Sequence, residues 1–335
     1  MIQKLENLYL PDEKTSVTAV INKENTCDLS VIIPVYNMDK YIEQCILSAT
    51  MQKTIYDIEI IVVDDGSFDK SPQIIAKLAA GDSRIITRRQ KNSGLSAARN
   101  AGLNIATGRY VFFLDADDTI ADGCFQDMLD KAYETGCDIV QCNFSNKVGQ
   151  HMNKSGWKPE KTFVQDYEEM CMIPGYAMMK VIRRELFNDV RFPENYWYED
   201  TIMHMQIFQK CKNGIYIIDK PYYVYFKNPC GITQSKRRSL RPLETVYVLE
   251  KIMKGMSEPE KKAVYNEVLR HLTSISYHRI KVMKRKYKRS AFKKMCDIVI
   301  SLGMNTTDEG LKEYEKIFYK RDYVKYILTG VMRRW

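Results

Sequence analysis

No stretch of this 335-residue chain is apolar over the roughly 18 to 20 residues that a membrane-spanning helix requires. Its first residues also lack the basic stretch and following apolar run that mark a secretory leader. The nine cysteines contain no CxxC pair, which argues against both a disulfide framework and a zinc site. We therefore expect a cytoplasmic protein, soluble or peripheral to a membrane, whose thiols are free and buried.

The chain also lacks internal repeats and low-complexity tracts, but its charge is unevenly distributed. Residues 236–335 hold 25 lysines and arginines against 11 aspartates and glutamates, a net charge of +14. Residues 1–235 carry the opposite sign, at −5. The excess of +9 in the whole chain therefore belongs to one end, and we place a separate basic region at 236–335.

Short apolar runs alternate with helical patterns over residues 29–120. Strands are predicted at 30–33, 59–63, 84–87 and 110–114, and helices at 39–52, 72–80 and 96–107, with Pro34 ending the first strand. Strands separated by helices of this length indicate βαβ units and a mostly parallel sheet, hence an α/β fold. Residues 1–28 are polar and are expected to be an N-terminal extension, whereas the pattern is helical from residue 240.

Acidic residues follow two of the predicted strands directly. Asp64 and Asp65 come after 59–63, and three aspartates come after 110–114. In such sheets ligands bind beyond the carboxyl ends of the strands. Clustered carboxylates repel one another, and Mg²⁺ or Mn²⁺ would relieve the repulsion while leaving positions open for substrate phosphates. A solvated acidic turn before a helix is the alternative for each segment.

Four segments in this order resemble the family 2 glycosyltransferases. They are SVIIPVYN at 30–37, VVDDGSFD at 62–69, NSGLSAARNAGL at 92–103 and GRYVFFLDADD at 108–118. The resemblance implies the GT-A fold, a Rossmann-like sheet flanked by helices, and inverting sugar transfer from a nucleotide-diphosphate sugar, with UDP favoured. On this basis we expect a catalytic domain at 29–235, with a donor half at 29–120 and an acceptor half at 121–235.

The resemblance also implies a nucleotide site built from matching residues. Tyr36 would pack against the uracil ring beside Pro34, and Asp65 would accept the uracil N3–H. Asn92 and Arg99 would face the nucleotide and its diphosphate. The structural alternatives are a core aromatic at Tyr36 and a surface helix residue at Arg99.

Asp115, Ala116 and Asp117 match the DxD motif of the family. By that match Asp115 would hold the ribose, and Asp117 would bind the Mn²⁺ or Mg²⁺ ion on the diphosphate. The same residues also fit the DxDxT nucleophile motif of haloacid-dehalogenase-like phosphatases, although that chemistry leaves the three earlier segments unexplained. A non-catalytic nucleotide-sugar-binding protein is a further alternative, which would keep Asp65 and Asp117 but would not need Asp200.

Sugar transfer also needs a carboxylate that takes the proton of the acceptor hydroxyl. Asp200 opens an apolar, helix-like run and, with Glu199, resembles the Glu-Asp pair on the acceptor side of the family. We expect Asp200 to be the general base and Glu199 its neighbour, with His204 on the acceptor side. An ordinary N-cap at Asp200 and a packed histidine at 204 are the alternatives.

The basic region interleaves lysines and arginines with apolar residues, as in KVMKRKYKR at 281–289. Basic amphipathic helices bind anionic membrane surfaces, so we expect membrane contact and a saccharide acceptor carried on a lipid diphosphate. A helical bundle packed on the catalytic domain or a homo-oligomer interface would explain the same pattern. No nucleic-acid motif accompanies the charge, and no nucleic-acid partner is expected.

Overall fold

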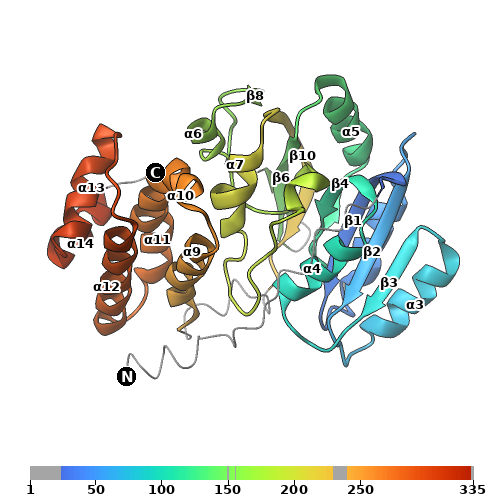
Figure 1. The fold of residues 1–335 in the computed structure, drawn as a ribbon. Coiled ribbons are helices and arrows are strands. Elements are labelled where there is room, and N and C mark those ends of the chain that lie inside the picture. The colour runs from blue at the N-terminus through green and yellow to red at the C-terminus, as the bar shows by residue number, and fades with distance from the viewer. Residues whose placement is uncertain (1–23, 149–150, 155, 229–239, 333–335) are drawn as a thin grey trace. The chain divides into compact units, whose positions relative to one another are not determined.

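The alternating apolar runs form one β-sheet, which contains ten strands among the described residues. The computed structural model describes residues 24–148, 151–154, 156–228 and 240–332 (Figure 1). The sheet and its helices make up one compact unit, the sheet unit, of residues 24–195 and 206–228. A second unit, the helical unit, comprises residues 196–205 and 240–332.

The strands of the sheet unit lie in the order β3-β2-β1-β4-β9-β6-β10-β5, with β7 beside β6 and β8 beside β10. Their bounds are β1 Cys27–Val35, β2 Ile58–Asp64, β3 Ile85–Arg89, β4 Gly108–Phe113, β5 Thr119–Ile120, β6 Ile139–Val148, β7 His151–Lys154, β8 Phe163–Val164, β9 Lys180–Arg183 and β10 Ile215–Phe226. The four strands β3, β2, β1 and β4 are parallel, as predicted. Beyond β4 the sheet is mixed, because β9 runs antiparallel to both β4 and β6.

The prediction that Pro34 ends the first strand is wrong. Strand β1 continues to Val35, and Pro34 pairs in register with Val63 of β2. Pairing of β1 with β4 has already ended at Ile32, whose carbonyl oxygen accepts the last hydrogen bond, from Leu114 N–H. Because alternate residues of β1 face opposite neighbours, Pro34 turns its missing N–H toward β4, on the side where pairing has ended, and the pairing with β2 is kept.

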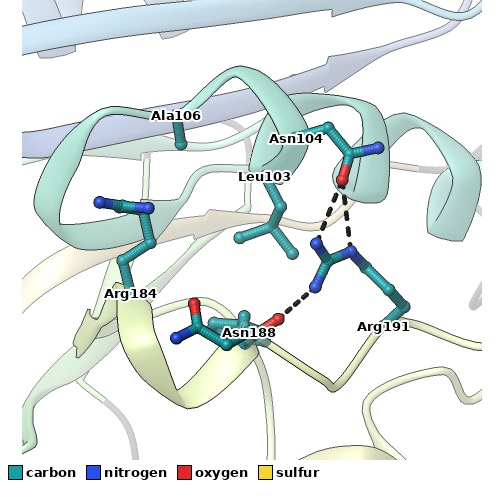
Figure 2. A pocket seen from close by; sticks show the side chains of 7 residues that line it. Leu103, Asn104, Ala106, Arg184, Asn188 and Arg191 are labelled. Atoms are coloured by element: carbon teal, nitrogen blue, oxygen red, sulfur yellow. Dashed lines mark hydrogen bonds between the residues drawn. The ribbon is translucent and has the colours of Figure 1, made fainter. Parts of the chain in front are cut away.

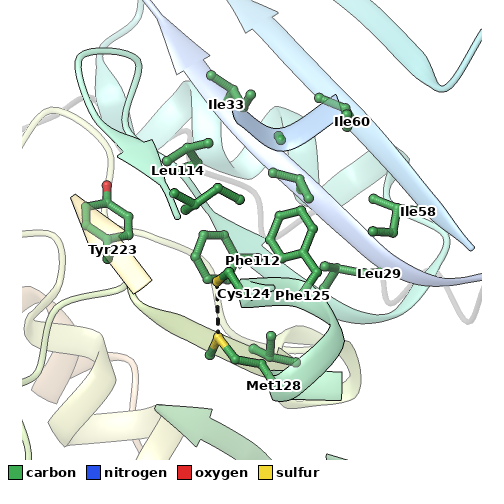
Figure 3. Packing of buried hydrophobic residues seen from close by; sticks show 14 of the residues in the cluster. Leu29, Ile33, Ile58, Ile60, Phe112, Leu114, Cys124, Phe125, Met128 and Tyr223 are labelled. Carbon is green, nitrogen blue, oxygen red and sulfur yellow. Dashed lines mark hydrogen bonds between the residues drawn. The ribbon is translucent and has the colours of Figure 1, made fainter. Parts of the chain in front are cut away.

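The core of the sheet unit lies between one face of the parallel strands and three helices. Leu29 and Ile33 of β1 and Phe112 of β4 are fully buried on that face (Figure 3). The helices that pack on it are α2 Ile42–Thr50, α3 Ser71–Gly81 and α5 Cys124–Thr135. Each fully buried side chain of this size stabilises the fold by roughly 1.5–3 kcal/mol.

Helix α4, Leu95–Ile105, covers the opposite face of the sheet. It approaches β1 at Gly102, where an added Cβ atom would lie 2.4 Å from Cγ2 of Ile32. Only glycine allows this approach, which places α4 directly against the central strands. The predicted end of this helix at residue 107 is two residues too late, because the helix ends at Ile105 and Gly108 begins β4.

Four short helical segments lie between residues 167 and 210 of the chain. They are α6 Tyr167–Met170, a 3₁₀ turn at Arg184–Phe187, a π-helical turn at Met203–Ile207 and α7 Phe208–Lys210. Of the eight cysteines that are described, seven are buried and Cys27 is half-buried, all as free thiols. The prediction of buried free thiols is therefore confirmed for the described residues.

The chain from residue 240 is helical, as predicted. Its elements are a 3₁₀ turn Arg241–Leu243, α9 Glu244–Lys254, α10 Glu258–Arg270, a π-helical turn His271–Ile275, α11 Ser276–Ile280, α12 Arg285–Leu302, α13 Glu309–Tyr319 and α14 Tyr323–Met332. Ser257 begins α10 with a capping box, in which its N–H donates to Glu260 Oε2 at 2.7 Å. Within the described ranges, no helix is both long and apolar enough to cross a bilayer.

Candidate functional site

The carboxyl ends of β1 and β2 are locked together by hydrogen bonds between their loops. The backbone N–H of Asn37 donates to Ser67 Oγ at 2.9 Å, and the N–H of Phe68 donates to Asn37 Oδ1 at 3.0 Å. Asn37 adopts a positive φ of 52° to make this exchange, a conformation that asparagine tolerates better than most residues. The two predicted nucleotide-binding segments therefore form one edge.

Asp65 holds the loop that leads into helix α4. Its Oδ1 accepts from the Gln90 side chain and from Ser93 N–H, and its Oδ2 accepts from Gly94 N–H, all within 2.9 Å. The residue is 3% exposed, and its carboxylate oxygens are hydrogen-bonded to the loop at residues 90–94. Its expected bond to a uracil N3–H stays a prediction.

Gly66 brings this turn against the same loop. Its φ is +78°, and an added Cβ atom would lie 2.8 Å from the backbone N of Asn92. A side chain there would clash with backbone, so the close contact requires glycine. Asn92 itself is exposed at this edge, which leaves its side chain available to a ligand.

Two aromatic rings are exposed at the same edge of the sheet. Tyr36, after β1, is 42% exposed, and Phe68, after β2, is 82% exposed. Their ring centroids lie 6.1 Å apart in an edge-to-face arrangement. Tyr36 is therefore not a core aromatic. Phe68 was not singled out from the sequence, although a large apolar residue inside an acidic turn motif was a usable signal.

Arg99 is buried inside the sheet unit instead of lying on the surface of helix α4. It is 1% exposed, and its Nη2 donates to Asp115 Oδ1 at 2.8 Å. The guanidinium also lies over the rings of Phe113 and Phe192, at 5.8 and 5.4 Å from their centroids. This arrangement fixes the first aspartate of the DxD segment to α4, the helix whose first turn is tied to Asp65.

The remaining aspartates of the DxD segment point to different partners. Asp117 is half-buried and accepts a hydrogen bond from Asn228 Nδ2 at 2.9 Å. Asp118 is turned inward, where its carboxylate accepts from the Tyr223 hydroxyl at 2.6 Å and from Phe226 N–H at 2.7 Å. Asp115 and Asp117 are thus left at the edge, whereas Asp118 anchors the segment to β10.

Burial and mutual repulsion make these carboxylates harder to ionise. Burial, with a smaller contribution from the Asp115 charge, raises the pKa of Asp117, whereas the Asn228 amide opposes the shift. Burial also raises the pKa of Asp118 to about 8, and the Asp115 charge adds to it. A cation placed among these groups would offset both effects.

The donor set at this edge fits a divalent ion that a substrate helps to bind. Among the described residues, no three His, Cys, Asp or Glu side chains gather as a preformed metal cluster. Asp115 and Asp117 still offer carboxylate oxygens, and Mg²⁺ or Mn²⁺ is commonly held by one or two carboxylates together with substrate phosphates. Asp117 can therefore hold the expected ion only with phosphate oxygens as further ligands.

Asp200, Glu199 and His204 belong to the helical unit. Among the described residues, Asp200 accepts no N-cap hydrogen bond through its side chain, and its Oδ1 lies 3.8 Å from Arg279 Nη2. His204 is buried, with its Nδ1 3.4 Å from Glu267 Oε1 of α10. These contacts favour the packed interpretation for His204 and give the N-cap interpretation of Asp200 no support.

A small cavity at the far end of helix α4 is not a nucleotide site (Figure 2). It measures about 20 Å³ and lies between Asn104, Arg184 and Arg191. Arg191 donates to Asn104 Oδ1 and to the backbone oxygens of Phe187 and Val190. A volume of this size holds one water molecule. Both arginines donate hydrogen bonds to nearby backbone carbonyl oxygens.

Comparison with known proteins assigns the chain to a family. The glycosyl transferase family 2 model matches residues 30–191. A glycosyltransferase of Haemophilus influenzae is 34% identical over 191 residues, which cover 56% of this chain and 74% of that protein. The chain belongs to glycosyl transferase family 2. This family assignment excludes the phosphatase interpretation.

Two further relatives define how far the likeness extends. EpsJ, a glycosyltransferase of Bacillus subtilis, is 33% identical over 62% of this chain and 63% of its own length. The chain thus spans less than two thirds of the length of EpsJ. Residues 1–349 of S. aureus TarS, solved with UDP-GlcNAc, superpose with a TM-score of 0.72 at 23% identity over 89% of each chain. That likeness confirms the GT-A fold with C-terminal helices.

Tyr223→Phe tests whether the inward aspartate organises the DxD segment. The Tyr223 hydroxyl donates to Asp118 and accepts from the Asp115 N–H at 3.3 Å, so its loss leaves a buried carboxylate short of a partner. We expect destabilisation by about 1–3 kcal/mol in urea unfolding. We also expect calorimetry to show UDP affinity, measured with Mn²⁺, falling about tenfold, equivalent to roughly 1.4 kcal/mol.

Tyr222→Phe is the matched control for that variant. The neighbouring hydroxyl donates to Asp127 and accepts from Lys220, away from the DxD segment. We expect UDP affinity to stay unchanged in this variant. Equal losses of UDP affinity in the two variants would contradict the anchoring role.

Proposed function

We propose that this glycosyltransferase moves a hexose or N-acetylhexosamine from a UDP-sugar to a saccharide hydroxyl with inversion, in assembly of a cell-surface polysaccharide or glycoconjugate. The observation that carries the proposal is a shared edge of the sheet: exposed Tyr36 and Phe68 follow β1 and β2, and Asp115 and Asp117 follow β4, which pairs in parallel with β1. The fold likeness to TarS, a protein solved with UDP-GlcNAc, supports UDP as the nucleotide.

On the donor side, the chain supplies an aromatic surface and a fixed pair of carboxylates. Tyr36 would receive the uracil face beside Pro34, and exposed Phe68 lies within 6.1 Å of the Tyr36 ring centroid. Asp115, held by Arg99, would accept from the ribose hydroxyls. Asp117 would hold Mn²⁺ or Mg²⁺, which neutralises charge on the departing diphosphate.

On the acceptor side, Asp200 would act as the general base. As the acceptor oxygen bonds to the anomeric carbon, its proton passes to the Asp200 carboxylate. The bond from that carbon to the diphosphate oxygen breaks, and UDP leaves with the electron pair. Attack from the side opposite the leaving group inverts the anomeric centre. Glu199 would adjoin the acceptor.

The basic helices would bring the enzyme to an anionic membrane, where a lipid-diphosphate-linked saccharide is a suitable acceptor. Lysines and arginines are exposed at the start of α12, and Val324 and Leu328, one turn apart on α14, are 64% and 60% exposed. The Arg289 guanidinium lies 5.5 Å from the Tyr323 ring, which joins the start of α12 to α14. Exposed apolar residues beside cationic ones suit an anionic lipid surface.

Asp117→Asn tests the donor assignment. We expect sugar transfer to fall by roughly 100-fold or more, because the diphosphate charge loses its main electrostatic support. In the wild-type protein, EDTA should abolish transfer and added Mn²⁺ or Mg²⁺ should restore it, whereas no added ion should restore the variant. Asp122→Asn, at an exposed residue five positions on, serves as the control with unchanged activity. Full activity of Asp117→Asn would reject the assignment.

Asp200→Asn tests the base. We expect UDP-sugar affinity to be unchanged and transfer to fall by about 100-fold to 10,000-fold, the usual range for loss of a general base. Asp297→Asn, which removes a carboxylate paired with Arg321 at 2.8 Å in the helical unit, should leave transfer unchanged. Wild-type rates in Asp200→Asn would show that another group accepts the proton.

Liposome flotation tests the membrane proposal. We expect the protein to float with vesicles that contain phosphatidylglycerol. With neutral phosphatidylcholine vesicles it should remain unbound at the bottom of the gradient. Replacing both Val324 and Leu328 by serine should weaken the binding, because each exposed apolar side chain contributes area to the lipid contact. Equal flotation with both lipids would contradict the proposal.

A further inference from the structure

The segment that carries Asp200 is fixed at Trp197 by the start of helix α9. The backbone N–H of Trp197 donates to Glu244 Oε2 at 2.6 Å, and Glu244 is fully buried. Arg241 donates to the other oxygen of that carboxylate at 2.7 Å, and its guanidinium lies 5.3 Å from the Trp197 ring centroid. One side of the segment is thus held by an arginine and a carboxylate acting together.

A second arginine holds the same segment from helix α11. The guanidinium of Arg279 lies 3.8 Å from the Tyr198 ring centroid, and its Nη1 donates to Thr245 Oγ1 at 2.9 Å. Its Nη2 lies 3.8 Å from Asp200 Oδ1. Three contacts in different directions leave this side chain little freedom, and they determine where its charge stands relative to the carboxylate.

The backbone at Tyr198 carries strain that these contacts must maintain. Its φ is 66°, in the left-handed region that a bulky aromatic residue rarely adopts. Residues in such conformations persist only where the surroundings over-determine them, and they occur at sites where geometry matters. The strained residue opens the turn that contains Asp200, because its carbonyl oxygen accepts from Thr201 N–H at 3.0 Å.

We propose that Arg279 is a positioning residue for the general base, so that helix α11 determines how the Asp200 carboxylate is presented. The inference rests on the proposed role of Asp200. At 3.8 Å the guanidinium attracts the carboxylate without donating a normal hydrogen bond to it. The charge therefore orients Asp200 and leaves its oxygen lone pairs available to the acceptor hydroxyl.

Arg279→Gln tests the inference in the full-length protein. We expect kcat to fall about tenfold to 100-fold, the loss that a misplacement of about 1 Å produces, while UDP-sugar affinity and melting temperature stay near their wild-type values. Arg279→Lys keeps the charge without the planar stacking and should recover part of kcat. If Arg279→Gln does not fold, Thr245→Val, which removes the hydroxyl that fixes the guanidinium, should lower kcat in the same direction.

A double-mutant comparison separates this inference from the assignment of the base. If Arg279 acts through Asp200, Arg279→Gln should add no further loss of kcat to the residual rate of Asp200→Asn. Arg321→Gln and Asp297→Asn, from an ion pair elsewhere in the helical unit, serve as controls with wild-type kcat. Additive losses, or wild-type kcat in Arg279→Gln, would overturn the positioning role. A fully active Asp200→Asn would instead reject the base.

Discussion

The ion pair between the buried Arg99 and Asp115 is the interaction on which the proposed donor site depends. A guanidinium that is 1% exposed needs a partner with good geometry, because an unpaired buried charge is strongly destabilising. The pair at 2.8 Å and the rings of Phe113 and Phe192 meet that need. It also ties the carboxyl end of β4 to α4, whose preceding loop is bonded to Asp65. The contacts that stabilise this part of the fold are therefore the same ones that hold Asp115 and Asp65 in place.

A second constraint comes from the far end of the chain's sheet. Strand β10 provides Tyr223 and Phe226, which hold Asp118, and Asn228, two residues beyond its end, holds Asp117. Over a hundred residues separate these partners from the aspartates in the sequence. The acidic turn is thus shaped by a strand that forms part of the acceptor half in the sequence-based division. Substitutions in β10 are therefore expected to change the positions of Asp117 and Asp118 without replacing either aspartate.

In the helical unit, two arginines hold one short segment of the chain. Arg241 and Arg279 each place a guanidinium over an aromatic ring of one short segment, Trp197 and Tyr198 respectively. Stacking and ion pairing then act together on adjacent residues, which is the geometry for which arginine is better suited than lysine. The basic residues of this region therefore fall into two groups. Arg241 and Arg279, both only partly buried, order the segment around Asp200, whereas the more exposed lysines and arginines are those on which the proposed membrane contact depends.

The sequence by itself determined the order of strands and helices over residues 29–120, the parallel half of the sheet and the acidic strand ends, because periodicity and strand-end position are local properties. It also led to the family, through four motifs within about 90 residues. Only the tertiary structure decided that Asp118 turns inward, that Arg99 is buried, that Phe68 stands beside Tyr36 and that Arg279 meets Asp200. Each of these outcomes depends on which distant residue lies opposite, and local patterns carry no information about that pairing. Pro34 shows the same limit: whether it ends a strand depends on the neighbour its missing N–H would face.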